Sequence, residues 1–244
     1  MRIFLVAALS VCAWAQTGLE RPPLGTMLDS NGAARPVYGV VGSVTLGGTT
    51  ATGVLSIACS RQLCLMKTDS AIQSSAGAIS APPGPAVFGL DQAAAYVYFP
   101  ESRQLARWHD TQLDWIPWDL PGEVLSLQAV SGSVHAAVRL NRQVSIVHLA
   151  LDDGSLAVLD GLPDTASAVM LLGSGVLYAD PDKVVLRRPD GTEQLFEVKA
   201  ANAFFALGDG YVEIRAGPST FALRIDPGRE RLFLLPEPVP ETRQ

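Results

Sequence analysis

The residues best suited to chemistry are three tryptophans, Trp108, Trp115 and Trp118, which lie within eleven residues of one another beside Arg107 and Asp114. A sugar ring stacks on an aromatic face and bonds to neighbouring carboxylate and guanidinium groups, and tryptophan and arginine also dominate protein interfaces. The cluster therefore predicts a binding surface for a polysaccharide or a protein. The alternative is that the tryptophans fill gaps between layers of strands, because strand alternation would direct Trp115 and Trp118 to opposite faces.

A second reactive pair is Cys59 and Cys64, which are expected to lie across a short hairpin from each other. Directly opposed cysteines are close enough for a disulfide when their backbone groups do not bond to each other. The sequence predicts a structural disulfide here. Free thiols or redox chemistry are the alternatives, and a zinc site would need two further ligands.

Metal and cofactor motifs are missing from the sequence. His109, His135 and His148 are expected on a turn and on separate strands, with no spacing typical of zinc ligands. The acidic turn Asp152–Asp153 precedes Gly154 but does not follow the calcium-loop pattern. We therefore predict no cofactor and no metal site, and interpret the aspartates as turn residues.

The elements that must position these residues repeat along the chain. A turn that contains aspartate recurs at intervals of 36 to 43 residues, between short apolar runs, at Asp29, Asp69, Asp110, Asp153, Asp190 and Asp226. Glycine or proline interrupts every stretch before a helix of three turns could form. Short strands with a period of about 40 residues are typical of a β-propeller.

Each unit contains about four strands, which makes one propeller blade. The clearest unit has strands at 203–207, 211–215, 221–225 and 231–235, and the full units are expected at 39–75, 86–120, 124–159, 168–198 and 203–235. A hairpin of 24–28 and 36–41 precedes them and is expected to be the third and fourth strands of a blade.

The predicted fold is all-β: a β-propeller of about five four-stranded blades plus this N-terminal hairpin, which forms an incomplete sixth blade. A closed five-blade ring with the hairpin outside, and a two-sheet sandwich, are the alternatives.

The repeat resembles the β-propeller superfamily over nearly the whole chain, and its architecture is similar to the NHL/YVTN group of exported bacterial propellers. The Gly-His and Trp-Asp repeats of WD40 proteins are missing. The segment 188–192 resembles part of a sialidase-type Asp-box without its serine and tryptophan. Such a resemblance implies a fold and carries no function.

The first fifteen residues have the features of a signal peptide. Arg2 is followed by an apolar stretch and by Ala13-Trp14-Ala15, which predicts cleavage after Ala15. A lipoprotein signal with Cys12 as the lipidated residue is the alternative. We expect a single propeller domain over 16–235, a proline-rich tail over 236–244, and a periplasmic or secreted location.

The charge pattern excludes some partners. The chain has 24 acidic and 18 basic residues and a net charge of −6, which becomes −7 when Arg2 is removed (24 acidic minus 17 basic). No block of like charge is long enough to predict binding to nucleic acid or insertion into a membrane.

The expected innermost strands, such as 124–128 and 168–172, are almost free of charge, and no nucleophile motif occurs. The sequence thus predicts a non-catalytic binding module whose partner is an envelope or secreted protein, or a polysaccharide. The alternatives are a small propeller glycoside hydrolase or lyase with carboxylates on loops, and a structural module that assembles with other copies through exposed strand edges.

Overall fold

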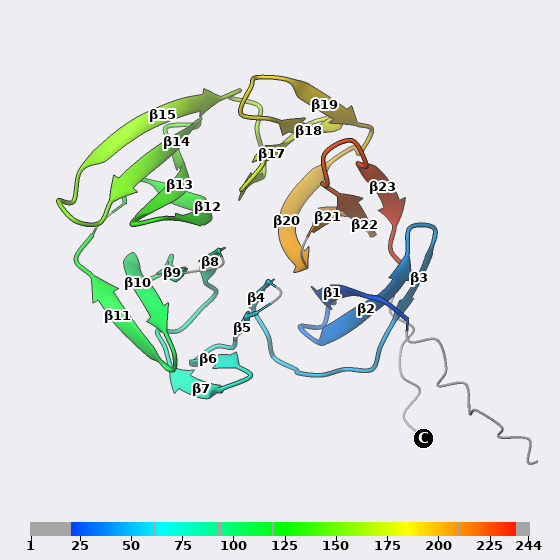
Figure 1. Cartoon of the computed structure of the whole chain (residues 1–244), viewed down its shortest axis with the longest axis horizontal. Coiled ribbons are helices and arrows are strands. Elements are labelled where there is room, and N and C mark those ends of the chain that lie inside the picture. The colour runs from blue at the N-terminus through cyan, green and yellow to red at the C-terminus, as the bar shows by residue number, and fades with distance from the viewer. Residues whose placement is uncertain (1–20, 61, 92–93, 119, 209, 238–244) are drawn as a thin grey trace, which may run out of the picture.

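The computed structural model describes residues 21–237 except 61, 92–93, 119 and 209. Within these ranges the secondary structure consists of strands and turns, and the strands form six antiparallel sheets placed around a central axis as the blades of a β-propeller (Figure 1). The predicted fold class is confirmed. The predicted signal peptide and nearly all of the C-terminal tail lie outside the described residues.

The first three blades cover the N-terminal half of the chain. Blade 1 has three strands, β1 (Pro23–Leu28), β2 (Ala34–Val40) and β3 (Ser43–Leu46). Blade 2 consists of β4 (Ser56–Cys59), β5 (Cys64–Lys67), β6 (Ala71–Ser74) and β7 (Gly77–Ser80). Blade 3 consists of β8 (Val87–Leu90), β9 (Ala95–Phe99), β10 (Gln104–His109) and β11 (Gln112–Ile116).

The remaining three blades each have four strands. Blade 4 consists of β12 (Glu123–Val130), β13 (Ser133–Leu140), β14 (Gln143–Ala150) and β15 (Leu156–Leu162). Blade 5 consists of β16 (Val169–Leu172), β17 (Gly175–Asp180), β18 (Lys183–Arg187) and β19 (Glu193–Phe196). Blade 6 consists of β20 (Ala201–Gly208), β21 (Tyr211–Ala216), β22 (Ser219–Arg224) and β23 (Arg231–Leu234).

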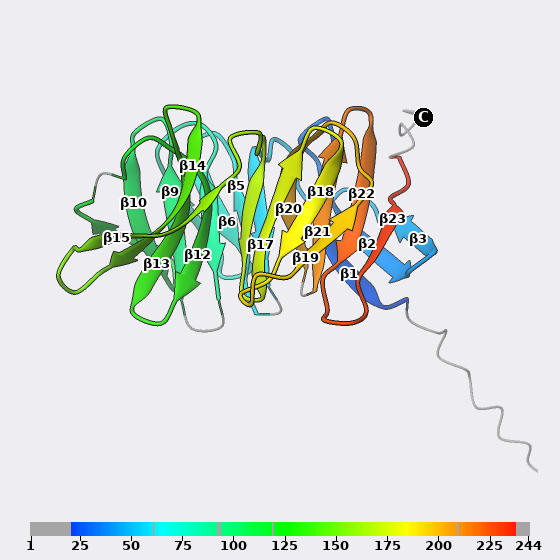
Figure 2. The same cartoon turned by 90° about the horizontal axis from the view of Figure 1, so that it is seen from above.

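In every blade the strands follow chain order from the axis outward, and Figure 2 shows that they run through the thickness of the disc. Six clusters of buried apolar side chains lie between the blades, one for each pair of neighbours. Middle strands are therefore covered on both sides: all five residues of β9 are buried, whereas six of the seven residues of β15 are exposed. The core is shared between blades, so each blade needs its neighbours to bury its apolar faces.

Blade 1 differs in one detail from the arrangement predicted from the sequence. The N-terminal hairpin forms the first two strands of its blade, because β1 contacts β4 and β20, the innermost strands of the neighbouring blades. The sheet also gains a third strand, β3, so the full unit expected at 39–75 is wrong: residue 39 belongs to β2, and the first four-stranded blade begins at Ser56.

The aspartate turns explain this error. Asp110, Asp153, Asp190 and Asp226 all follow the third strand of a blade, but Asp69 follows the second and Asp29 follows the first. A hairpin turn of any kind favours aspartate. An aspartate therefore predicts a turn but does not indicate which two strands of the blade the turn joins.

Blades 1 and 6 meet at a seam that closes the ring. Arg215 on β21 donates a hydrogen bond to the carbonyl oxygen of Leu28 at the end of β1. The same guanidinium pairs with the fully buried Glu213 at 2.8 Å and lies 4.4 Å from the ring centre of Phe205. Non-covalent contacts of this kind hold the first and last blades of the described chain together.

Candidate functional site

The structure places the five residues of the predicted tryptophan surface on two sides of blade 3. Trp108 on β10 is buried in the cluster between blades 2 and 3. Trp115 on β11 lies on the same side of the sheet, with its ring centre 5.7 Å from that of Phe99, and half of it is exposed. These two tryptophans therefore face blade 2.

The other three residues face blade 4. Arg107 and Asp114 are direct strand partners on β10 and β11, and both are exposed. Strand alternation places them on the same face of the sheet as Ile116, which packs against the cluster between blades 3 and 4. Trp118 is half-buried against the cluster between blades 3 and 4. The five residues do not form one continuous aromatic surface, and Trp115 and Trp118 lie on opposite faces as strand alternation predicts.

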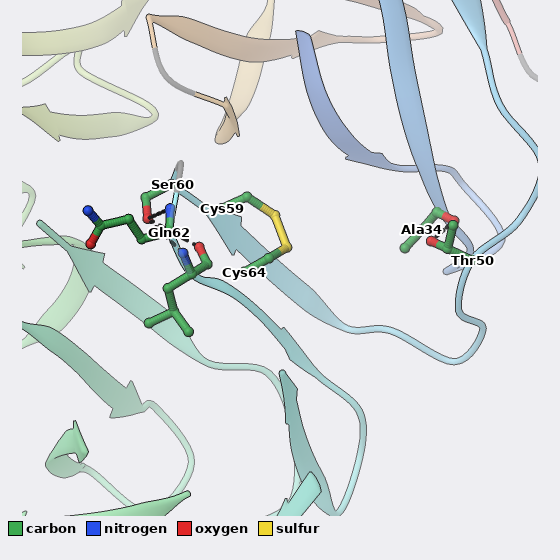
Figure 3. Close-up of a disulfide and its surroundings, with 7 residues drawn as sticks. Ala34, Thr50, Cys59, Ser60, Gln62 and Cys64 are labelled. Carbon is green, nitrogen blue, oxygen red and sulfur yellow. Dashed lines mark hydrogen bonds between the residues drawn. A yellow bond between two sulfur atoms is a disulfide. The ribbon is translucent and has the colours of Figure 1, made fainter. Parts of the chain in front are cut away.

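The predicted disulfide between Cys59 and Cys64 is present (Figure 3). The two residues are direct partners at the ends of β4 and β5. The next pair outward, Ser60 and Leu63, closes the hairpin through a bond from the Ser60 N–H to the Leu63 carbonyl at 2.7 Å. The disulfide packs against the apolar cluster between blades 1 and 2, so it fastens the innermost hairpin of blade 2 at this boundary.

The structure separates the three histidines into a pair and a single residue. His135 on β13 and His148 on β14 are direct strand partners, and His135 Nε2 lies 3.1 Å from His148 Nδ1. Burial, and secondly the neighbouring His148, lower the pKa of His135. His109 stands apart at the exposed end of β10. Across the described part of the chain, no group of three or more side chains is placed to hold a metal ion.

A cavity lies between blades 4 and 5, and we call it the inter-blade hollow. Its volume is about 640 Å³. Apolar side chains form much of its wall: Val130, Ile146, Leu159, Leu171, Leu172 and Val176. Polar side chains also line it: Gln128, His135, Asp160, Arg187 and Arg188. An apolar pocket with a few convergent polar groups is the usual form of a ligand site.

Two ion pairs hold the arginines of the hollow in place. Arg187 on β18 donates through Nη2 to Asp160 on β15 at 2.5 Å and to the Gly161 carbonyl at 3.4 Å. Arg188 donates through its own Nη2 to Glu230 of blade 6. For both arginines, Nε and Nη1 have no hydrogen-bond partner among the described residues, so each guanidinium keeps free donors.

A second cavity, of about 450 Å³, follows the central axis. It is lined by residues of β4, β8, β12, β16 and β20 and shares Gln128, Leu171, Leu172 and Gly173 with the inter-blade hollow. The two cavities therefore adjoin. The described residues that line the central cavity include a single carboxylate, that of Asp91, and are mostly apolar, as expected for the inner strands.

Comparisons with known proteins identify the architecture. No family model and no curated protein matches the sequence. Among solved structures, the chain is similar to one from the nidogen/laminin complex, with a TM-score of 0.62 and 11% identity over 88% of this chain and 93% of that chain. It is also similar to PorZ, a bacterial surface component of the type-IX secretion system of Porphyromonas gingivalis, with a TM-score of 0.54 and 11% identity. That match covers 88% of this chain but only 38% of PorZ. At this identity, the likeness shows a β-propeller fold alone.

The inter-blade hollow was not visible in the sequence. Its polar residues come from β12, β13, β15, β18 and the turn that follows β18. Arg188 begins the segment 188–192 that resembles part of an Asp-box, but this resemblance did not identify a site. The signal available was the charge of consecutive Arg187 and Arg188 at the end of a strand, beside an aspartate turn. That pattern is too common to identify a site.

Proposed function

We propose that this protein is a non-catalytic, extracytoplasmic binding module that holds its partner in the inter-blade hollow. The partner is an envelope or secreted protein, or a polysaccharide. The observation that carries the proposal is the hollow itself, because it combines apolar walls with guanidinium groups whose donors remain available. The predicted signal peptide and a disulfide, which forms in oxidising compartments, support the location.

The similar chains agree with a binding role without assigning one. One belongs to a complex between nidogen and laminin, and another is a component of a bacterial surface. In the described residues no helix is long and apolar enough to cross a membrane.

Filling the hollow tests the proposal. A Cβ built on Gly173, where the two cavities adjoin, would approach only Gln128 Nε2, at 3.8 Å, so the Cβ of Gly173→Trp meets no backbone atom and its indole is placed at the boundary of the two cavities. Gly48→Trp is the matched control, because nothing lies within 4 Å of its Cβ position. Wild type and both variants are used to capture proteins and glycans from envelope and secreted fractions, after circular dichroism has shown that all three fold.

We expect Gly173→Trp to lose a partner that wild type and Gly48→Trp both capture. If Gly173→Trp captures the same partner, the hollow is not the site. Trp115→Ala is included in the same assay, and loss of the partner by this variant alone would move the site to the predicted tryptophan surface. Release of sugars from a captured polysaccharide would favour the glycoside hydrolase or lyase.

A further inference from the structure

Strand β15 is the outermost strand of blade 4 and forms one wall of the inter-blade hollow through Leu159 and Asp160. It has seven residues, whereas β7, β11, β19 and β23, the outermost strands of the other four-stranded blades, have four or five. Its apolar side chains are exposed: Leu156 by 40%, Val158 by 69% and Leu159 by 53%. A long, exposed, apolar edge strand is unusual in a monomeric protein, because it offers pairing to any extended chain.

The backbone of β15 has free hydrogen-bonding groups along this edge. The Ala150 N–H donates to the Ser155 carbonyl at 3.0 Å, which fixes the alternation of the ladder between β14 and β15. The next bonded pair is His148 with Ala157, so the N–H and C=O groups of Leu156 and the N–H group of Val158 point away from the sheet. The ladder shifts register after Val158. No described residue bonds to these outward groups.

We propose that the partner is a protein that adds an extended segment to β15 as a fifth strand of blade 4 and places an acidic side chain in the inter-blade hollow. This inference rests on the proposed function and specifies the class of its partner. In strand addition, main-chain bonds supply affinity and pockets for alternate side chains supply specificity. Here the free edge of β15 supplies the main-chain bonds, and the hollow beside it supplies a pocket for a side chain.

The unused guanidinium donors of the hollow favour an acidic side chain. Its lining contains two guanidinium groups and one carboxylate, Asp160, which pairs with Arg187, while Glu230 pairs with Arg188 from outside the lining. Burial favours the neutral form of His135. Arg187 and Arg188 each use one nitrogen for their existing partners, so their remaining N–H groups can donate to an incoming carboxylate. The apolar wall accommodates the stem of that side chain and its neighbours.

The edge argues for a polypeptide over a polysaccharide. Alternating N–H and C=O groups at the spacing of a strand match an extended backbone, and a glycan has no such repeat. Among the described outermost strands, β15 is also the one whose residues line the hollow, which distinguishes it from the free edges found on every blade.

The experiment selects random twelve-residue peptides, displayed on phage, against the whole mature protein. Val158→Pro removes one outward N–H from β15 without breaking the ladder to β14. Leu195→Pro on β19 is the matched control: Leu195 is 57% exposed, and the bond from the Arg188 N–H to the Thr192 carbonyl places the Leu195 N–H outward in the same way.

We expect selected peptides to combine β-branched or aromatic residues with an acidic residue. Val158→Pro should weaken the binding of these peptides by at least about tenfold, and Leu195→Pro by less than about twofold. Replacing the acidic residue of the peptide by its amide, Asp by Asn or Glu by Gln, should weaken binding by about tenfold. If no peptide is enriched, or if Val158→Pro binds as tightly as wild type, the inference is overturned.

Hydrogen exchange of wild type provides a second readout that does not depend on the folding of a variant. The Leu156 and Val158 amides should become protected when a selected peptide binds, and unchanged exchange would reject strand addition. A dimer that Val158→Pro dissociates would show that a second copy occupies the edge, which also overturns the proposal. Capture of a glycan that Gly173→Trp abolishes, without any peptide enrichment, would reject strand addition while leaving the proposed function intact.

Discussion

Asp29, the first of the recurring turn aspartates, holds its turn together through its side chain. Its side chain is almost fully buried and accepts bonds from the N–H groups of Asn31 and Ala33 and from Arg35 Nε, at 2.8 to 3.0 Å. Burial opposes its ionisation, but the bonds from Ala33, Arg35 and Asn31 outweigh it and hold the pKa of Asp29 below its usual value.

Because the folded state lowers this pKa, the stabilisation is present above the pKa of the unfolded chain and is lost as pH falls through the folded value. We expect Asp29→Ala to lower the free energy of unfolding by about 2 kcal/mol at pH 7 and by less at pH 3. Urea unfolding at the two pH values measures this. Asp153→Ala, at a fully exposed turn, is the control, and an equal loss in both variants would contradict the assigned role of Asp29.

The paired histidines predict a second pH dependence. The pKa of His135 is lowered in the folded state, so the unfolded chain binds more protons and stability falls as pH drops below about 6.5. His135→Gln should show a smaller fall in melting temperature between pH 7.5 and pH 5 than wild type. His109→Gln, whose histidine is exposed, should retain the wild-type pH dependence. If both variants follow wild type, protonation of His135 is not linked to folding.

The disulfide joins the last residue of β4 to the first residue of β5, within a single hairpin. The loop between the cysteines is short, so the bond restricts the unfolded chain little. We expect the double variant Cys59→Ala/Cys64→Ala to lose at most about 2 kcal/mol in the free energy of unfolding. Denaturant titration of oxidised wild type against the variant measures this. A larger loss would mean that the disulfide supports the boundary between blades 1 and 2 as well as its own hairpin.

Elements also show how far the sequence could predict the structure. The four strands of blade 6 lie within two residues of their predicted bounds, because glycine and aspartate turns separate clean apolar runs there. Blade 1 was misassigned because its turn has the same chemistry as a turn between third and fourth strands. The His135–His148 pair and the inter-blade hollow depend on strand register and on the packing of neighbouring blades, which no local pattern encodes.

The seam between blades 1 and 6 depends on Arg215. Burial raises the pKa of Glu213, while Arg215 favours its charged form. Removing the guanidinium would leave a buried carboxyl group without its cation and remove the bond to Leu28. We expect Arg215→Met to cost about 3 kcal/mol, and Arg215→Met/Glu213→Met to recover part of this loss, since paired replacement of buried ions is often tolerated.

Chemical denaturation of both variants tests this prediction. Arg231→Met on β23, an exposed outer strand of the same blade, controls for the loss of a positive charge. A double variant no more stable than the single one would show that the cost arises from repacking of the seam.

The seam also limits the order in which the blades can assemble. The contact between Leu28 and Arg215 joins segments 187 residues apart, so the entropy of closing a very long loop must be overcome before it forms. Blades 2 to 5 can stack as they leave the ribosome, but blade 1 stays exposed on one side until blade 6 arrives. A chain that stops before blade 6 therefore exposes an apolar face of blade 1 to chaperones and proteases. This face is covered only when blade 6 has been synthesised and packs against blade 1.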